Sequence, residues 1–412
     1  MSTDSKCVDM LQEIETLCAF EKRGPTKEGE RKAAEYLKKR MEEIGLEAKI
    51  EPFKTSPHYY WVYFLHMALA IALGAVSLIT RPAWVPVLAA ALLCLVLLSF
   101  WGDLTTKFHI IRNLIPRFPS QNVVGHKRGE NPRKHIIVLA HYDAAKVSKT
   151  VFNPELDEKI AKFFKEKFNK TPNVMMPMII AMFLLICVSV ARAVASAGKA
   201  MWISTGVIQG IASLILLIAA GAFLDIGTGH YVPGAIDNLT GIAASLSIAE
   251  DVARNQLKNS DFTFLATGCE EAIMMGMVEY MKRHGKDLDP ENTYFINLES
   301  IGGGNVCYAT SEGFVRVRPY SQELISIAEK LKENGDFPEI GTYEVRMGTD
   351  GMVPLVRGFK AITIISVNEN NIVPNYHCSL DIPENVDISV TERARDFALR
   401  MIRELDAKTS AG

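Results

Sequence analysis

The stretch HIIVLAHYD, residues 135–143, joins a run of five apolar residues to His141 and Asp143 at its end. A short apolar run bounded by polar residues is typical of a strand buried in the interior of a sheet. Side chains that follow such a strand directly lie at its carboxyl end, where ligands bind in open α/β sheets. The stretch therefore predicts an interior strand with a candidate site at its end.

Four further stretches predict strands: LEAKIEPF (46–53), DFTFLATG (261–268), NTYFINLES (292–300) and KAITIISV (360–367). Helical patterns alternate with them at about 27–43, 239–255, 272–284, 322–334 and 390–405. Strands that alternate with helices favour an α/β fold, with a mainly parallel sheet sandwiched by helices.

Histidines and acids gather at the predicted strand ends. Glu270 and Glu271 follow the strand 261–268, Glu299 ends the strand 292–300, and His377 lies ten residues beyond the strand 360–367. Asp237 opens the helix pattern that follows a long apolar stretch. Because the carboxyl ends of parallel strands meet at one edge of the sheet, we expect these side chains to converge.

Two imidazoles and several carboxylates suit a pair of divalent metal ions that clamp a water molecule. The pair Glu270–Glu271 can supply one ligand and one general base, and Asp143 can orient the ring of His141. Each residue alone also has a structural interpretation. Adjacent glutamates are usually a solvated surface pair, Asp237 can cap a helix, and His377 can be a hydrogen-bonded loop residue.

Four stretches without Asp, Glu, Lys or Arg are each about as long as a bilayer requires, roughly 20 residues. They are residues 55–80, 82–102, 171–191 and 200–224, with all four tryptophans near their ends. We expect two transmembrane hairpins, residues 55–102 and 171–224. The polar pieces 1–54, 103–170 and 225–412 then form one discontinuous domain.

Basic residues are distributed unequally around these spans. The predicted hairpin tips carry Arg81, Arg192 and Lys199. The other flanks carry Lys39, Arg40, Lys49, Lys54, Lys107, Arg112, Arg117, Lys159, Lys162, Lys165, Lys167 and Lys170. This asymmetry favours a cytoplasmic polar domain. The stretch 154–170 is amphipathic, as in a helix that lies on an anionic leaflet or in an ordinary surface helix.

The composition excludes other classes of protein. The formal net charge of −2, from 45 basic and 47 acidic residues, provides no field for nucleic acid. Seven cysteines without a CxxC pair argue against a disulfide framework and favour reduced thiols. The polar, acidic first thirty residues do not resemble a secretory signal peptide.

Five motifs together resemble one enzyme family. They are AHYDAA (140–145), GAIDNLTGIAA (234–244), GCEEAIMMG (268–276), INLESIGG (296–303) and NYHCSLDIPENVD (375–387). Their residues and their order are similar to those of the co-catalytic zinc exopeptidases, which include bacterial leucine aminopeptidases and glutamate carboxypeptidases. The resemblance covers the polar pieces, and the apolar hairpins are insertions relative to the usual domain.

The resemblance implies a role for each site residue. Asp237 would bridge two zinc ions, Glu271 and His377 would complete one site, and His141 and Glu299 the other. Other divalent ions such as cobalt could replace zinc. Glu270 would be the general base and Asp143 would support the ligands. A late Ser-Asp pair of the family corresponds loosely to Thr349–Asp350.

One position departs from the family pattern. Glu299 stands where the aminopeptidases more often have Asp, which could weaken one metal site or mark another specificity. Glutaminyl cyclases resemble the family in fold but bind one zinc, and the intact ligand set here favours the two-metal peptidases.

The sequence therefore predicts a membrane-embedded exopeptidase that acts on peptides, most simply an aminopeptidase. A carboxypeptidase, a dipeptidase, an amide hydrolase for membrane-associated substrates and an inactive peptidase-like scaffold remain as alternatives.

Overall fold

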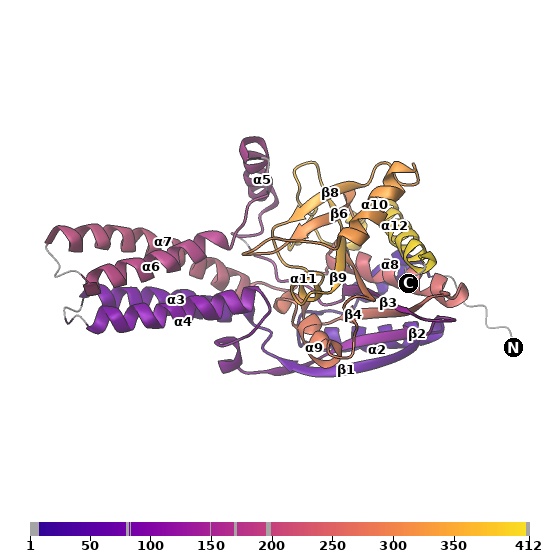
Figure 1. Ribbon diagram of the computed structural model, residues 1–412, viewed down its shortest axis with the longest axis horizontal. Coiled ribbons are helices and arrows are strands. Elements are labelled where there is room, and N and C mark those ends of the chain that lie inside the picture. Colours follow the sequence, from indigo (N-terminus) through magenta and orange to yellow (C-terminus); the bar gives the residue numbers. More distant parts are fainter. Residues whose placement is uncertain are drawn as a thin grey trace.

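The computed structural model describes residues 8–79, 82, 84–148, 150–168, 171–194 and 199–408. An α/β body lies beside a bundle of four long helices that extends away from it (Figure 1). The helices of the body are α1 (Met10–Cys18), α2 (Glu28–Glu43), α5 (Pro154–Phe168), α8 (Thr240–Arg254), α9 (Met275–His284), α10 (Gln322–Glu333), α11 (Met352–Val356) and α12 (Ile388–Ala407). Its strands are β1 (Glu47–Thr55), β2 (Phe118–Lys127), β3 (Lys134–His141), β4 (Ser260–Thr267), β5 (Thr293–Glu299), β6 (Asn305–Glu312), β7 (Arg318–Pro319), β8 (Gly341–Val345) and β9 (Lys360–Val367).

The strands form one mixed sheet in the order β1-β2-β4-β3-β5-β9-β6-β7, and β8 pairs with β6. The four central strands, β4, β3, β5 and β9, run parallel, with Ala140 opposite Ala266 and Ile296 opposite Ile362. Every residue of β5 is buried, so helices and loops cover both faces of the sheet there. The α/β class and its largely parallel central sheet are confirmed.

The flanks of the sheet differ from the expectation. The sequence predicts five strands, and all five form, but β2, β6, β7 and β8 are additional. Strand β2 pairs antiparallel with both β1 and β4, and β6 pairs antiparallel with β9. Strands β7 and β8 are short, and β2 and β6 contain several polar residues. A strand near a sheet edge does not need the long continuous apolar run that marks a central strand.

The bundle consists of α3 (Tyr59–Ile79), α4 (Trp84–Leu104), α6 (Met176–Val194) and α7 (Lys199–Thr228). By length and composition, all four helices could cross a membrane. Apolar side chains such as Leu95 and Ile218 point outward, and 56% and 66% of their surface is exposed. Polar side chains lie inside instead: His66 Nε2 is 2.9 Å from Ser99 Oγ. This pattern, apolar outside and polar within, suits lipid as the surrounding solvent.

Some sequence predictions concern residues outside the described part of the chain. The turn at Arg81 and most of the connection from Arg192 to Lys199 lie there, as does Cys7. The six cysteines in the described ranges are all free. Arg192 itself is described and is not at an exposed tip, because its Nε donates to Thr205 Oγ1 at 3.1 Å inside the bundle.

The bundle holds the loop that leaves β3. Lys146 Nζ donates to the Gly227 carbonyl near the end of α7 at 2.6 Å and lies 4.8 Å from the centroid of the Tyr60 ring in α3. Ser148 Oγ donates to Asp225 Oδ2 at 2.6 Å. The amphipathic stretch forms helix α5, which projects from the body close to the bundle (Figure 1). The ends of the apolar helices therefore fix a loop that begins at the candidate site.

Candidate metal centre

The candidate site forms where the central strands end. His141 is the last residue of β3, and Glu299 is the last residue of β5. Glu271 lies in the short turn η3 (Glu270–Ala272) after β4, and His377 lies in the loop after β9. Asp237 lies in the turn η2 (Ala235–Leu239), directly before α8. Because these strands run parallel, residues far apart in the chain meet at one sheet edge.

Asp237 stands between two similar groups of side chains. Its Oδ1 is 3.1 Å from His141 Nε2, and its Oδ2 is 3.1 Å from His377 Nε2. Glu299 Oε1 lies 3.3 Å from His141 Nε2, and Glu271 Oε1 lies 3.3 Å from His377 Nε2. Within each group the candidate ligand atoms lie within 4.8 Å of one another. Glu299, despite its extra methylene, reaches the same cluster.

The hydrogen bonding of His141 tests whether a cation fits. Its Nδ1 lies 3.2 Å from the backbone carbonyl of Asp143, and a carbonyl only accepts, so Nδ1 carries the hydrogen. In the neutral ring, Nε2 then directs a lone pair at the carboxylates of Asp237 and Glu299. Ligands about 2.0–2.2 Å from a tetrahedral zinc ion lie about 3.3–3.6 Å apart, close to the separations of 3.1 and 3.3 Å seen here. The donor set therefore fits a divalent cation in each group.

The charge balance of the site also favours cations. Six carboxyl groups and two imidazoles line the site or lie directly beside it: Asp143, Asp237, Glu270, Glu271, Glu299, Asp350, His141 and His377. Burial raises the pKa of Glu270 well above its usual range. Burial alone would lower the pKa of His377, but the carboxylates of Glu271 and Asp237 raise it to about 10. So many buried acids are costly unless cations compensate their charge.

Glu270 lies beside the ligand groups, where a base is needed. One of its carboxylate oxygens is within 4.8 Å of a ring nitrogen of His141 and of a carboxylate oxygen of Glu271. The Asp143 carboxylate fixes this turn, because it accepts hydrogen bonds from the backbone N–H groups of Glu270 and Glu271, both at 3.0 Å. The sequence predicts that Asp143 orients His141. The backbone carbonyl of Asp143 makes the hydrogen bond to His141 Nδ1, whereas the carboxylate oxygen Oδ1 of Asp143 is 3.6 Å from the same nitrogen.

The pair Thr349–Asp350 lies next to the site. Asp350 is fully buried and accepts a hydrogen bond from Thr267 Oγ1 at the end of β4. Thr349 Oγ1 accepts a hydrogen bond of 3.1 Å from Asn297 Nδ2, and the same amide lies 3.3 Å from Glu299 Oε2. Thr349 therefore contacts Glu299 through Asn297, and Asp350 contacts the end of β4 directly. Burial raises the pKa of Asp350 to about 7.

Three supporting residues are absent from the sequence prediction. Asp381 accepts hydrogen bonds from the backbone N–H groups of Ile236 and Asp237, at 2.6 and 3.3 Å. Glu30 accepts from the backbone N–H of Cys269 at 3.0 Å, and the Arg23 guanidinium donates to the Tyr142 carbonyl at 2.7 Å. A single charged residue in a loop or on a helix has no local sequence pattern that marks it as a support for the site, although Asp381 does lie within the motif 375–387.

Comparisons with known proteins identify a matching family model and similar folds. Residues 216–402 match the model of Peptidase family M28. An aminopeptidase from Aneurinibacillus sp. strain AM-1 has a similar fold, with a TM-score of 0.55 and 12% identity over 97% of this chain and 94% of that one. A zinc aminopeptidase from Bacillus subtilis has a TM-score of 0.52 and 13% identity over 96% and 94%.

A glutaminyl cyclase from Porphyromonas gingivalis is equally similar in fold, with a TM-score of 0.55 and 12% identity over 96% of each chain. No curated protein sequence matches the chain. The resemblance to zinc exopeptidases is thereby confirmed for the fold and for the matched segment. The solved structures do not by themselves distinguish peptidase from cyclase.

Proposed function

From this resemblance and the geometry of the site, we propose that the protein is a membrane-embedded dinuclear zinc exopeptidase that removes residues from the amino termini of peptides. The observation that carries the proposal is the position of Asp237, whose two oxygens lie at equal distances from His141 and His377. A carboxylate shared in this way fits two cations better than one, which favours a two-metal peptidase over a one-metal cyclase.

Each residue has a chemical role in this proposal. Asp237 would bridge the two ions, His141 and Glu299 would hold one, and Glu271 and His377 would hold the other. Bound zinc ions would polarise the scissile carbonyl and lower the pKa of water. Glu270 would accept the proton of the attacking water and pass it to the leaving amine. Asp143 would keep Glu270 and Glu271 in place through their backbone N–H groups.

Metal content and substrate preference test the proposal together. We expect the detergent-purified protein to hold about two zinc ions per chain and to cleave amino-acid amides with a free amino terminus. The N-acetylated amides serve as matched controls and should remain intact. Turnover of blocked or carboxyl-terminal substrates alone would contradict the aminopeptidase assignment. A protein that neither binds zinc or cobalt nor cleaves any substrate would be a scaffold.

One alternative substrate class is favoured by a specific observation. The loop that leaves His141 is fixed to the ends of α3 and α7 by Lys146 and Ser148. The site thus lies close to the end of the apolar bundle, where an amide in a membrane-associated molecule could reach it. The same assay with lipid-linked amides would identify an amide hydrolase of this kind.

The orientation of the protein is a separate part of the proposal. The distribution of basic residues supports a body on the cytoplasmic side. We expect tags inserted at Arg81 or Lys199 to be accessible from outside intact cells, and a tag after residue 408 to be accessible only after permeabilisation. The reverse pattern of labelling would place the metal centre outside the cytoplasm.

A further inference from the structure

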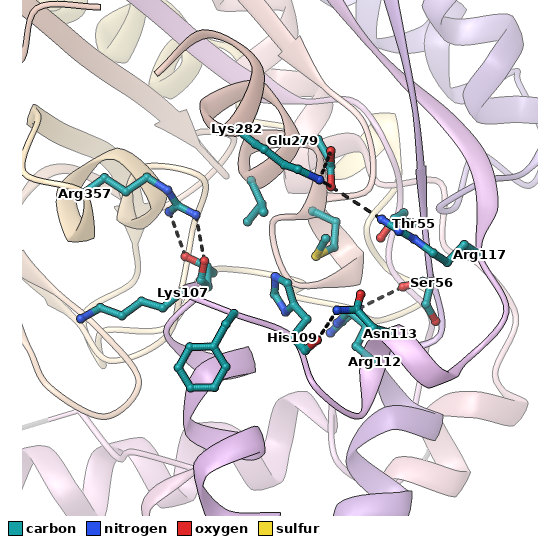
Figure 2. A pocket seen from close by; sticks show the side chains of 14 residues that line it. Thr55, Ser56, Lys107, His109, Arg112, Asn113, Arg117, Glu279, Lys282 and Arg357 are labelled. Atoms are coloured by element: carbon teal, nitrogen blue, oxygen red, sulfur yellow. Dashed lines mark hydrogen bonds and ion pairs between the residues drawn. The ribbon is translucent and has the colours of Figure 1, made fainter. Parts of the chain in front are cut away.

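A pocket apart from the metal centre lies between the end of α4 and helix α9 (Figure 2), and none of the candidate metal ligands lines it. Its volume is about 560 Å³, within the range of about 300–1,000 Å³ that small-molecule sites occupy. Its basic lining residues are Lys107, His109, Arg112, Arg117, Lys282 and Arg357. The described lining residues include one acid, Glu279. Basic side chains therefore outnumber acidic ones in the lining of the pocket.

Two of these cations form the rigid wall of the pocket. Arg112 is buried and makes a bidentate ion pair with Asp103 of α4, with N–O distances of 2.8 and 2.7 Å. Arg357 donates to the backbone carbonyls of Thr106 and Val353, at 2.8 and 2.9 Å. Their geometry is set by the protein itself, so they shape the cavity and are not free to bind a ligand closely.

Of the other cations, Lys107 lies 5.3 Å from the centroid of the Trp101 ring. Arg117 and Lys282 lie at the mouth, where Arg117 Nη2 donates to the Lys54 carbonyl at 2.9 Å and its other N–H groups remain for a ligand. The side chains of Arg117 and Lys282 are 45% and 69% exposed. Both approach the Glu279 carboxylate only loosely, at 3.8 and 3.5 Å, so one negative charge faces two positive ones. His109 lines the same space (Figure 2). The Nδ1 atom of His109 lies 2.7 Å from Asp103 Oδ1. The buried Nε2 atom of His109 has no hydrogen-bond partner among the described residues.

The position of the pocket decides between ligands. The segment 105–117 that forms one side of it leaves α4 directly, and the Ile111 N–H donates to Ser99 Oγ of α4 at 3.2 Å. The same segment exposes Ile110 and Leu114, at 45% and 78% of their surface. Apolar side chains facing outward beside clustered cations, at the end of an apolar helix, are typical of a membrane interface.

We propose that this pocket binds the phosphate of an anionic phospholipid headgroup. Arg117 and Lys282 would contact the phosphate oxygens, while Ile110 and Leu114 would lie among the upper acyl carbons. A headgroup that carries its own cation, such as phosphocholine, would bring that cation close to the two basic side chains and bind less well. The proposal rests on the membrane insertion proposed above and is independent of the peptidase activity.

Lipid retention during purification tests the site. We would extract the full-length protein in detergent with equal amounts of phosphatidylglycerol and phosphatidylcholine, and count the lipids bound per chain by mass spectrometry. About one phosphatidylglycerol per chain is expected. The double variant Arg117→Gln/Lys282→Gln should bind it about thirtyfold more weakly, because each basic residue near an anionic membrane surface strengthens binding by about fivefold. Both side chains are exposed, so the variant should fold.

The matched control is Lys127→Gln/Lys258→Gln, which removes two charges at the end of β2 and before β4, at the opposite end of β2 from the pocket residue Thr55, and should retain the lipid. Equal retention of both lipids, or undiminished retention in the pocket variant, would overturn the proposal. Labelled inorganic phosphate provides a further arm, and saturable phosphate binding without phosphatidylglycerol retention would also overturn it. Resistance to alkaline carbonate extraction, measured first, shows membrane insertion separately from headgroup binding.

Discussion

Replacing Glu270 with Gln is expected to lower kcat by about 10²–10⁴-fold, the contribution typical of a positioned general base. The amide keeps the size and shape of the carboxylate but cannot accept the proton of the attacking water. Glu270 lies beside both ligand groups without being needed to hold either one. The zinc content should therefore stay at about two ions per chain while turnover of a free amino-acid amide is lost.

Glu291→Gln is the matched control for this change. Glu291 is 84% exposed on the surface of the body, so the same chemical substitution there should leave both zinc content and turnover unchanged. If Glu270→Gln kept turnover within about twofold of the wild type, another group would have to be the base. If it lost zinc as well, Glu270 would be a ligand and its role would have to be reassigned.

Replacing Asp237 with Asn should have the largest effect on metal binding. The change removes the negative charge shared by both groups and turns one of the two oxygens into an N–H donor. Loss of a single supporting partner already weakens metal binding by about 10–100-fold, and a shared ligand should cost at least as much. We expect zinc content to fall from about two ions to one or fewer, with loss of turnover.

The thermal stability of the protein gives an independent measurement of this effect. Zinc at about 1,000 times its Kd stabilises the folded state by about 4 kcal/mol, so a chelator should lower the Tm of the wild type. The Asp237→Asn variant should respond much less to the chelator. Asp287→Asn, which changes an acid in the loop after α9, should behave as the wild type. Two tightly bound zinc ions in Asp237→Asn would contradict the bridging role.

Local patterns in the sequence were enough to locate the strands that carry the site. The apolar run before His141 and those before Glu270 and Glu299 mark central strands, because such strands are buried on both faces. Parallel strands then bring their carboxyl ends to one edge, whatever their separation in the chain. The four apolar helices were equally evident, since each follows from a long apolar run without Asp, Glu, Lys or Arg.

The support of the site could not be predicted in the same way. Asp143 and Asp381 act through backbone N–H groups that lie 127 to 145 residues away in the chain. Such hydrogen bonds depend on how loops are placed in space, and no local periodicity encodes them. Strand β2 was hidden for a related reason, because it pairs near the sheet edge, where a polar sequence is tolerated.

The sequence by itself determined the α/β class, the apolar helices and the set of acids and histidines at the strand ends. Only the tertiary structure decided that Asp237 stands at equal distances from two histidines, one 96 residues before it and the other 140 residues after it. It also placed Arg117 and Lys282 around one pocket beside α4. Side-chain type follows from the chain, but the distances that make a metal site or an anion site arise from the packing of distant segments.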